Sequence, residues 1–215
     1  MYVPAPPAQH ALALAPVGIV STTSTLATPP LGRALSTTLR VQGARLNVLD
    51  GRRVSVTGTL SPGLSGRTVT LQAIGRHGWS TVAHALTRAK GRFRLRYLPR
   101  RTGSRRVRLS FAGDGADLGA HRRLGRLNVY RLAEASWYGG GGGLACGGSL
   151  TTATMGVANK TLPCGTLVTL RYNGHSIRVP VIDRGPYVAG REFDLTQAAK
   201  QALGFGDTGR LWSTR

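Results

Sequence analysis

The chain has 215 residues and carries 29 Lys and Arg against eight Asp and Glu, a formal net charge of +21 at pH 7. Its hydrophobic content of 41% suits a globular protein, and no apolar run is long enough to predict a transmembrane helix. The length allows one large domain or two small ones. So strong a positive field attracts polyanions such as nucleic acid, an anionic cell-wall polymer or an acidic lipid surface, and charge alone does not separate these partners.

Residues 1–38 differ from the rest, because they are rich in Pro, Ala, Ser and Thr. We predict a leader or a disordered linker here. The apolar stretch from His10 resembles part of a signal peptide, but no Lys or Arg precedes Arg33. A signal peptide that starts upstream and a linker both remain open.

Residues 39–130 show short segments in which apolar and polar positions alternate, separated by turn signals at spacings of about 8 to 12 residues. This pattern predicts a basic, immunoglobulin-like β-sandwich. The segments are 52–59, 68–74, 80–87, 91–98 and 105–113. Between 40 and 130 lie 19 basic and three acidic residues. In 91–98 we expect arginines on the solvent face, which would explain much of the charge by folding alone.

The C-terminal part has a different composition, glycine-dense and less basic. Segments 166–172 and 175–183 are predicted strands, joined by Asn173-Gly174 in a two-residue hairpin. A loop follows. The segment 194–205 is predicted to contain a helix with an apolar stripe from Leu195 to Leu203 and with Gly204 just past its end.

The chain has two cysteines, Cys146 and Cys164. A bridge between them would close a loop of about 17 residues and stabilise the fold by roughly 3 kcal/mol. It would also indicate an oxidising, extracytoplasmic compartment. Two separate buried thiols are the alternative.

Three of the eight acidic residues fall in Val181–Thr196. Asp183 ends an apolar strand and should open onto a groove, unless it satisfies turn amides or pairs with Arg184. Asp194 stands just before the predicted helix, where we favour a helix cap over a catalytic role. Glu192 is interpreted as an exposed loop charge.

Three motifs in order resemble the rare lipoprotein A (RlpA) family: ASWYGG at 135–140, NKTLPCGT at 159–166 and the segment 181–204. Expansins and barwin-like proteins use a similar barrel. The resemblance implies a six-stranded double-psi β-barrel with one short helix over 133–215. It also implies an extracytoplasmic protein, secreted or associated with the cell wall, that acts on peptidoglycan glycan strands.

Some members of this family are lytic transglycosylases, which leave a 1,6-anhydro end on the glycan. The resemblance makes Asp183 the candidate acid and base of that reaction. Candidate substrate-binding residues are Asn159, Arg184, Tyr187, Asp194, Trp137 and Tyr138. Aromatic faces can stack on sugar rings, although core packing is the alternative for these side chains.

The sequence departs from the family pattern at two positions. Where catalytic members typically carry Glu and His, this chain has Gly148 and Asn159. Asn cannot transfer a proton at neutral pH, and His175 in the hairpin does not replace the histidine by position. Cleavage of the glycan therefore stays open beside a non-catalytic, expansin-like binding or wall-loosening module.

Other partners and cofactors receive less support. The basic sandwich could bind anionic wall polymers, whereas nucleic acid is not favoured because neither interleaved exposed aromatics nor a reading motif is evident. The GGGGG run at 139–143 is not a phosphate cradle, since no GK[ST] follows it. The histidines show no ligand spacing, so we predict no metal and no cofactor.

Overall fold

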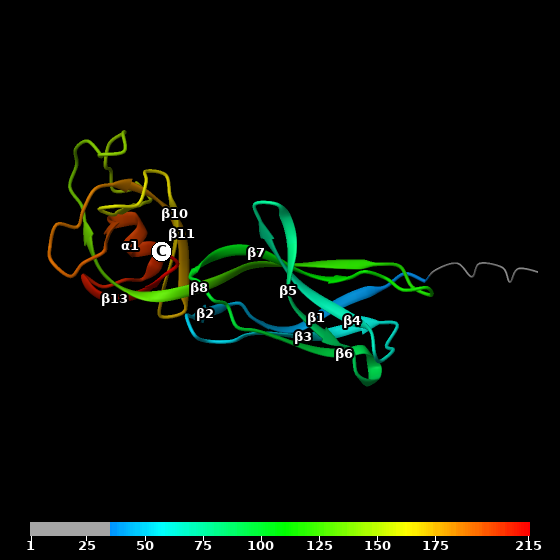
Figure 1. The fold of residues 1–215 in the computed structure, drawn as a ribbon. Coiled ribbons are helices and arrows are strands. Elements are labelled where there is room, and N and C mark those ends of the chain that lie inside the picture. The colour runs from blue at the N-terminus through cyan, green and yellow to red at the C-terminus, as the bar shows by residue number, and fades with distance from the viewer. Residues whose placement is uncertain (1–34) are drawn as a thin grey trace, which may run out of the picture. The chain divides into compact units, whose positions relative to one another are not determined.

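The computed structural model describes residues 35–215, which are mainly β-structure with one α-helix (Figure 1). Most of the predicted leader or linker therefore lies outside the described residues. In residues 35–215, no helix has the length and apolar character needed to cross a membrane. The elements are β1 (Thr38–Arg45), β2 (Asn47–Leu49), β3 (Val54–Ser61), β4 (Thr68–Gly75), β5 (Gly78–Leu86), η1 (Ala89–Gly91), β6 (Arg92–Tyr97), β7 (Gly103–Phe111), β8 (Ala120–Tyr138), β9 (Val157–Ala158), β10 (Leu167–Tyr172), β11 (His175–Asp183), β12 (Phe193–Thr196), α1 (Gln197–Leu203) and β13 (Thr208–Ser213).

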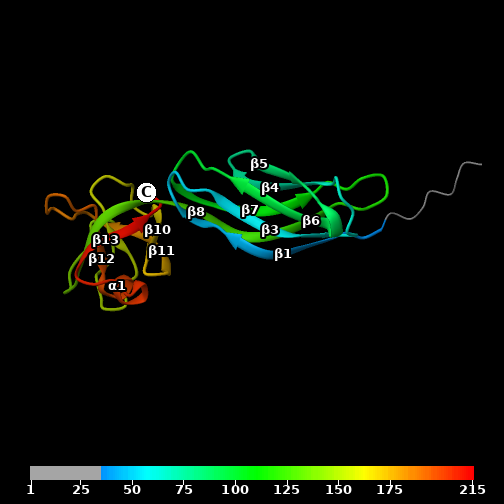
Figure 2. The ribbon, with the colours of Figure 1, turned by 90° about the horizontal axis from the view of Figure 1, so that it is seen from below.

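Two sheets form the N-terminal part of the described chain. One has the order β1-β3-β6, and the other contains β5-β4-β7-β8 with β2 paired to β8 (Figure 2). Inward side chains of both sheets, among them Val56, Leu71, Leu95 and Leu109, make one hydrophobic core. This is a sandwich of two sheets, while its likeness to the immunoglobulin fold stays a prediction.

The alternating pattern located β3 to β7 to within a few residues, but it missed β1. The reason is a break in the β1 register between Val41 and Gly43, where one extra residue interrupts the pairing with β3. Such a bulge also interrupts the alternation of apolar and polar positions in the sequence. The inward position of Phe93 and Leu95 in β6, with arginines outside, is as expected.

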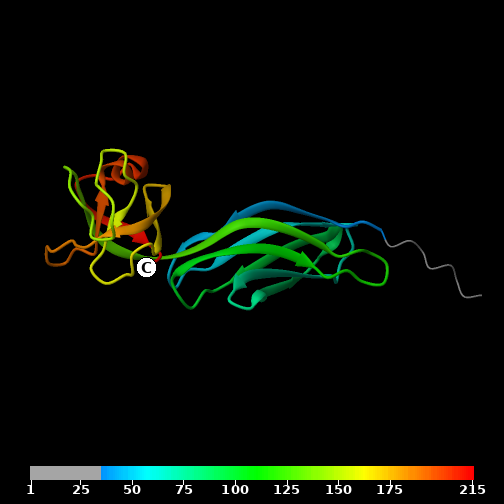
Figure 3. The ribbon, with the colours of Figure 1, turned by 90° about the horizontal axis from the view of Figure 1, so that it is seen from above.

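Strand β8 runs without a break across the predicted boundary between the two domains, and it can be followed as one green to yellow-green ribbon in Figure 3. Its last residues begin the C-terminal sheet, in which the order is β12-β9-β11-β10-β13-β8. A further parallel pairing of β12 with β8 joins the two ends of this path. A second core, which includes Val181, Phe193 and Leu195, fills its interior.

The β10–β11 hairpin turns at Asn173 and Gly174, whose φ angles of 42° and 88° are both in the left-handed region. Two positive φ angles are what a type I′ turn requires, so the predicted hairpin is confirmed. Gly204 follows the last residue of α1 with a left-handed φ of 66°, as predicted for a glycine that ends a helix.

The predicted start of the helix was wrong. α1 begins at Gln197, and its cap is Thr196, whose side-chain hydroxyl accepts a hydrogen bond from the Ala199 amide at 3.3 Å. Asp194 lies earlier, inside β12, where the backbone is extended and pairs in parallel with β8. Asp194 therefore does not cap the helix, and its carboxylate is available for other contacts.

Candidate functional site

Asp183 is the last residue of β11, and one of its carboxylate oxygens is held by the backbone. Its Oδ1 accepts hydrogen bonds from the amides of Ala145 at 2.9 Å and Arg184 at 2.8 Å. Asp183 as a whole is half-buried, and its carboxylate lies close enough to the Tyr138 hydroxyl to act on it. The two backbone amides thus fix the direction of the carboxylate at the strand end.

A disulfide keeps the Ala145 amide beside Asp183. Cys146 and Cys164 are bridged with their Cα atoms 5.6 Å apart, which confirms the predicted pair. The Cys146 amide also donates to the Ile182 carbonyl at 3.2 Å. Because a bridge of this loop length contributes about 3 kcal/mol, the glycine-rich loop is anchored where it meets Asp183.

A second acid lies two strands away. In the registers of β9, Ala158 is the partner of Asp183 on one side and of Asp194 on the other. Strands are spaced about 4.8 Å apart, so the backbones of the two acids are roughly 10 Å apart. Asp194 accepts a hydrogen bond from the Ser136 hydroxyl, its neighbour in β8. Neither acid forms an ion pair within the described residues.

Tyr138 completes this group. Its hydroxyl is buried and has no hydrogen-bond partner of standard geometry in residues 35–215. Burial first, and then the negative charge of Asp183, raise the pKa of Tyr138 well above its usual value of 10, with Asp194 adding to the effect. The phenol therefore stays protonated as a hydrogen-bond donor. We call Asp183, Asp194, Tyr138 and Ser136 the Asp183 cluster.

Asn159 and Arg184 brace the loop that follows β9. The Asn159 side chain accepts from the amides of Thr161 and Leu162 and donates to the Glu192 carbonyl at 2.9 Å. The Arg184 guanidinium donates to the carbonyls of Asn159 at 3.1 Å and Leu162 at 3.0 Å. It does not pair with the Asp183 carboxylate. Direct contact of Asn159 or Arg184 with substrate stays a prediction.

The three aromatic residues predicted to stack on sugar rings do not lie on one face. Trp137 and Tyr138 are successive residues of β8, so their side chains leave the strand on opposite sides. The Trp137 indole donates to Asp207 at 2.8 Å, and the Lys200 ammonium lies 4.1 Å from the centre of its ring. A sugar could stack on that face only by displacing the cation. Tyr187 is 81% exposed in the loop after Asp183, and its ring is open to a ligand.

Two further positions bear on the chemistry. Gly148, where the resemblance expects Glu, has a φ of 83° and nothing within 4 Å of an added Cβ. A side chain would have room there, but L residues rarely adopt that backbone conformation. Glu192 forms a two-point ion pair with Arg131, with one contact of 2.8 Å. It is therefore a structural charge rather than a free one.

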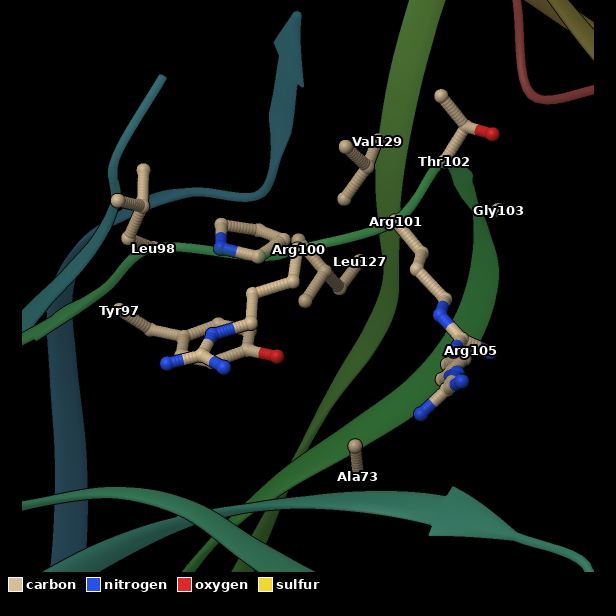
Figure 4. Close-up of a pocket in the computed structure, with 11 residues that line it drawn as sticks. Ala73, Tyr97, Leu98, Arg100, Arg101, Thr102, Gly103, Arg105, Leu127 and Val129 are labelled. Atoms are coloured by element: carbon tan, nitrogen blue, oxygen red, sulfur yellow. The ribbon is translucent and has the colours of Figure 1, made fainter. Parts of the chain in front are cut away.

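The sequence did not indicate Ser136, Lys200 or Asp207 as parts of the site. Ser136 and Asp194 meet only through the parallel pairing of β8 and β12, which joins residues 58 positions apart. A different hollow, a cavity of about 320 Å³, lies in the sandwich and includes none of the barrel acids (Figure 4). Its lining combines apolar residues such as Leu127 and Val129 with arginines.

Comparison with known proteins finds matches in the C-terminal region. The family model described as lytic transglycolase matches residues 132–211. The C-terminal region is RlpA-like. It shares 44% identity over 80 residues with the probable endolytic peptidoglycan transglycosylase RlpA of Aquifex aeolicus, 40% over 106 residues with that of Synechocystis, and 41% over 87 residues with the endolytic peptidoglycan transglycosylase RlpA of Pseudomonas aeruginosa.

The matches cover 35%, 43% and 38% of this chain, and 35%, 33% and 26% of the respective relatives. The chain thus spans about a third or less of the length of these relatives. Among solved structures, the Streptomyces papain inhibitor is 28% identical, with 40% of this chain and 94% of that chain covered and a TM-score of 0.32. A TM-score at that level does not establish a common fold.

Proposed function

We propose that the RlpA-like barrel binds peptidoglycan glycan strands outside the cytoplasm, with the Asp183 cluster as its contact site. The observation that carries this proposal is a half-buried carboxylate that two backbone amides hold in place and that forms no ion pair within residues 35–215. A fixed carboxylate of this kind can accept hydrogen bonds from sugar hydroxyls. The exposed ring of Tyr187, close by in sequence, offers a stacking face.

Several features favour binding without turnover. A general acid works best with a pKa near the operating pH, and Tyr138 beside Asp183 has a pKa raised far above it. The positions where the resemblance expects Glu and His hold a left-handed Gly148 and an Asn159 whose amide is engaged with backbone. The cluster thus offers a hydrogen-bond donor in the Tyr138 phenol and hydrogen-bond acceptors in the two carboxylates.

Cleavage is the second candidate. In that case Asp183 would protonate the leaving glycosidic oxygen and then take the proton of the sugar's 6-hydroxyl as that oxygen closes the 1,6-anhydro ring. Asp194 provides a second carboxylate, one strand beyond Ala158. This favours cleavage, because a carboxylate would stabilise the positive charge that develops on the sugar. The names of the relatives, all transglycosylases, support it too.

The test uses purified sacculi freed of other wall polymers, at about 200 mM salt to suppress binding by the field of the whole protein. We expect the protein to co-sediment with sacculi and to release no 1,6-anhydromuropeptides by mass spectrometry. Asp183→Asn should weaken binding about tenfold, as a lost charged hydrogen bond would.

The matched control is Glu134→Gln, which removes the same charge from an exposed position in β8. It should leave binding unchanged. Release of anhydro products by the wild type but not by Asp183→Asn would replace the binding proposal with the transglycosylase. Equal binding by all three proteins would remove Asp183 from the site.

A further inference from the structure

The outer face of the β1-β3-β6 sheet carries a regular set of arginines. The registers place Arg40 and Arg92 on either side of Thr59, and Arg45 and Arg96 on either side of Ser55. Arg94 lies in the row between, next to Thr57. We call Arg40, Arg45, Arg92, Arg94 and Arg96 the arginine face. All five are exposed, because the alternate positions of the same strands point into the core.

None of these arginines is neutralised within the described chain. The five form no side-chain hydrogen bond and no ion pair in residues 35–215, and β1, β3 and β6 contain no acidic residue. The opposite sheet differs, since Arg108 bonds to Gln72 at 2.8 Å and lies 4.4 Å from the centre of the Trp79 ring. Arg108 of that sheet is thus held by neighbouring side chains, whereas the five residues of the arginine face are not.

The geometry of the face is linear. Arg92, Arg94 and Arg96 follow one another along β6 at intervals of two residues, about 6.6 Å apart. These three line a shallow hollow over that strand together with Arg88 and the largely buried Phe93. A row of evenly spaced cations in a shallow hollow suits a chain of evenly spaced anions better than a compact ligand.

We propose that the arginine face binds a linear polyol phosphate, the chemistry of an anionic wall polymer. A glycerol phosphate unit has twice as many chain bonds as an amino-acid residue, so its extended repeat is about 6.6–7.2 Å by the same bond geometry. Successive phosphates can therefore meet successive arginines of β6. Arginine binds phosphate through two parallel N–H donors, which strengthens each contact.

A polymer without bases fits the face better than a nucleic acid. Single-stranded nucleic acids have a similar phosphate repeat, but proteins that hold them also stack the bases on aromatic side chains. The exposed positions of β1, β3 and β6 carry no aromatic side chain, and Phe93, which also lines the hollow, is only 4% exposed. Bases would find no stacking surface there, so only the charged backbone of the ligand is recognised.

The test measures binding of the full chain to a defined glycerol phosphate oligomer at 50 and 200 mM salt. Each phosphate contact of a single-stranded polyanion lowers the slope of log affinity against log salt concentration by about 0.7. Five contacts therefore predict a slope of about −3.5, or a roughly 100-fold loss of affinity over that range. The triple variant Arg92→Gln, Arg94→Gln, Arg96→Gln should leave a slope of about −1.4. Its thermal unfolding should match the wild type, since the changed side chains are exposed.

The matched control removes three exposed arginines elsewhere, as Arg76→Gln, Arg101→Gln, Arg122→Gln, and changes the net charge by the same amount. It should keep most of the wild-type slope and affinity. If both triple variants lose affinity equally, the binding belongs to the overall field and the arginine face is rejected. An oligothymidylate of equal charge that binds more tightly than the glycerol phosphate oligomer would replace the proposal with a nucleic-acid site.

Discussion

The sandwich and the barrel use their acidic residues in different ways. In the sandwich, Asp114 and Asp117 both contact the buried guanidinium of Arg67, so the acids stabilise the fold. In the barrel, Glu134, Glu192 and Asp207 are ion-paired, but Asp183 and Asp194 are not. The two exceptions lie on either side of Ala158.

This contrast is informative because cations outnumber acids so strongly, at 29 to eight. An acid in such a chain has many cations available, yet Asp183 and Asp194, like the exposed Asp50 of the sandwich, form no ion pair within residues 35–215. The Asp183 cluster uses backbone amides and a serine hydroxyl instead. The reverse holds for the arginine face, where cations are kept away from acids.

The largest effect on stability is expected from a substitution of Arg67 in the sandwich. Its side chain is 7% exposed; it forms ion pairs with Asp117 and, at 3.0 Å, with Asp114, and it donates a hydrogen bond to the Pro62 carbonyl at 3.3 Å. Arg67→Met leaves the buried Asp117 without its partner, and removal of one member of a buried pair costs about 3–5 kcal/mol. Chemical denaturation of the full chain followed by circular dichroism measures the loss.

Arg122→Met serves as the control, because it removes an exposed arginine and should change the unfolding free energy by less than about 0.5 kcal/mol. Adding Asp117→Leu to Arg67→Met should restore much of the loss, since no unpaired charge then remains buried. A loss below about 1 kcal/mol for Arg67→Met alone would show that the sandwich acids are not structural in this sense.

Much of this fold could be predicted from local sequence. Alternation located β3 to β7, Asn173-Gly174 located the hairpin, and the cysteine pair located the bridge. Residues 194–196 were misassigned because Leu195 continues the apolar stripe of the helix in sequence. The parallel pairing with β8 overrides that local pattern, and no local signal records a partner 58 residues away.

The site was less predictable than the fold for the same reason. Asp183 was predicted as a candidate from the resemblance to the RlpA family, together with its position at a strand end before Arg-Gly-Pro. The burial of the Tyr138 hydroxyl depends on segments that meet only in the folded chain, and so does its distance from Asp183. The separation of Trp137 from Tyr138 could have been inferred from strand alternation, had β8 been recognised to extend through Tyr138.

The Asp183 cluster itself can be probed through Tyr138, whose raised pKa favours the neutral phenol in the folded state. The stability this contributes is fully present below the ordinary tyrosine pKa of 10 and is lost as the pH rises through the folded pKa. Asp183→Asn removes the second cause of the shift, so Tyr138 should ionise at a lower pH, still above 10 because burial remains. Absorbance at alkaline pH, with Tyr138→Phe subtracted, measures this titration.

Glu192→Gln tests whether any loss of negative charge in this loop has the same effect. Glu192 pairs with Arg131 and is not among the causes of the Tyr138 shift, so the titration should not move. An unchanged titration in Asp183→Asn would mean that the carboxylate does not act on the phenol, and the cluster would reduce to two separate acids.

The smallest effect is expected at Asp207, the exposed counterpart of the Arg67 pair. A hydrogen bond from Lys200 first, and one from the Trp137 indole second, lower the pKa of Asp207 below its ordinary 3.8. Its stabilising contribution is therefore present above that value and is lost as the pH falls through the lower folded pKa. The indole N–H resonance of Trp137, followed by NMR in acid, should shift with a midpoint below 3.8. Lys200→Met should move that midpoint upward without a measurable change in unfolding at neutral pH, because exposed ion pairs contribute little. A large loss of stability in this variant would contradict the contrast between a buried pair that holds the sandwich and an exposed pair that only orients Trp137.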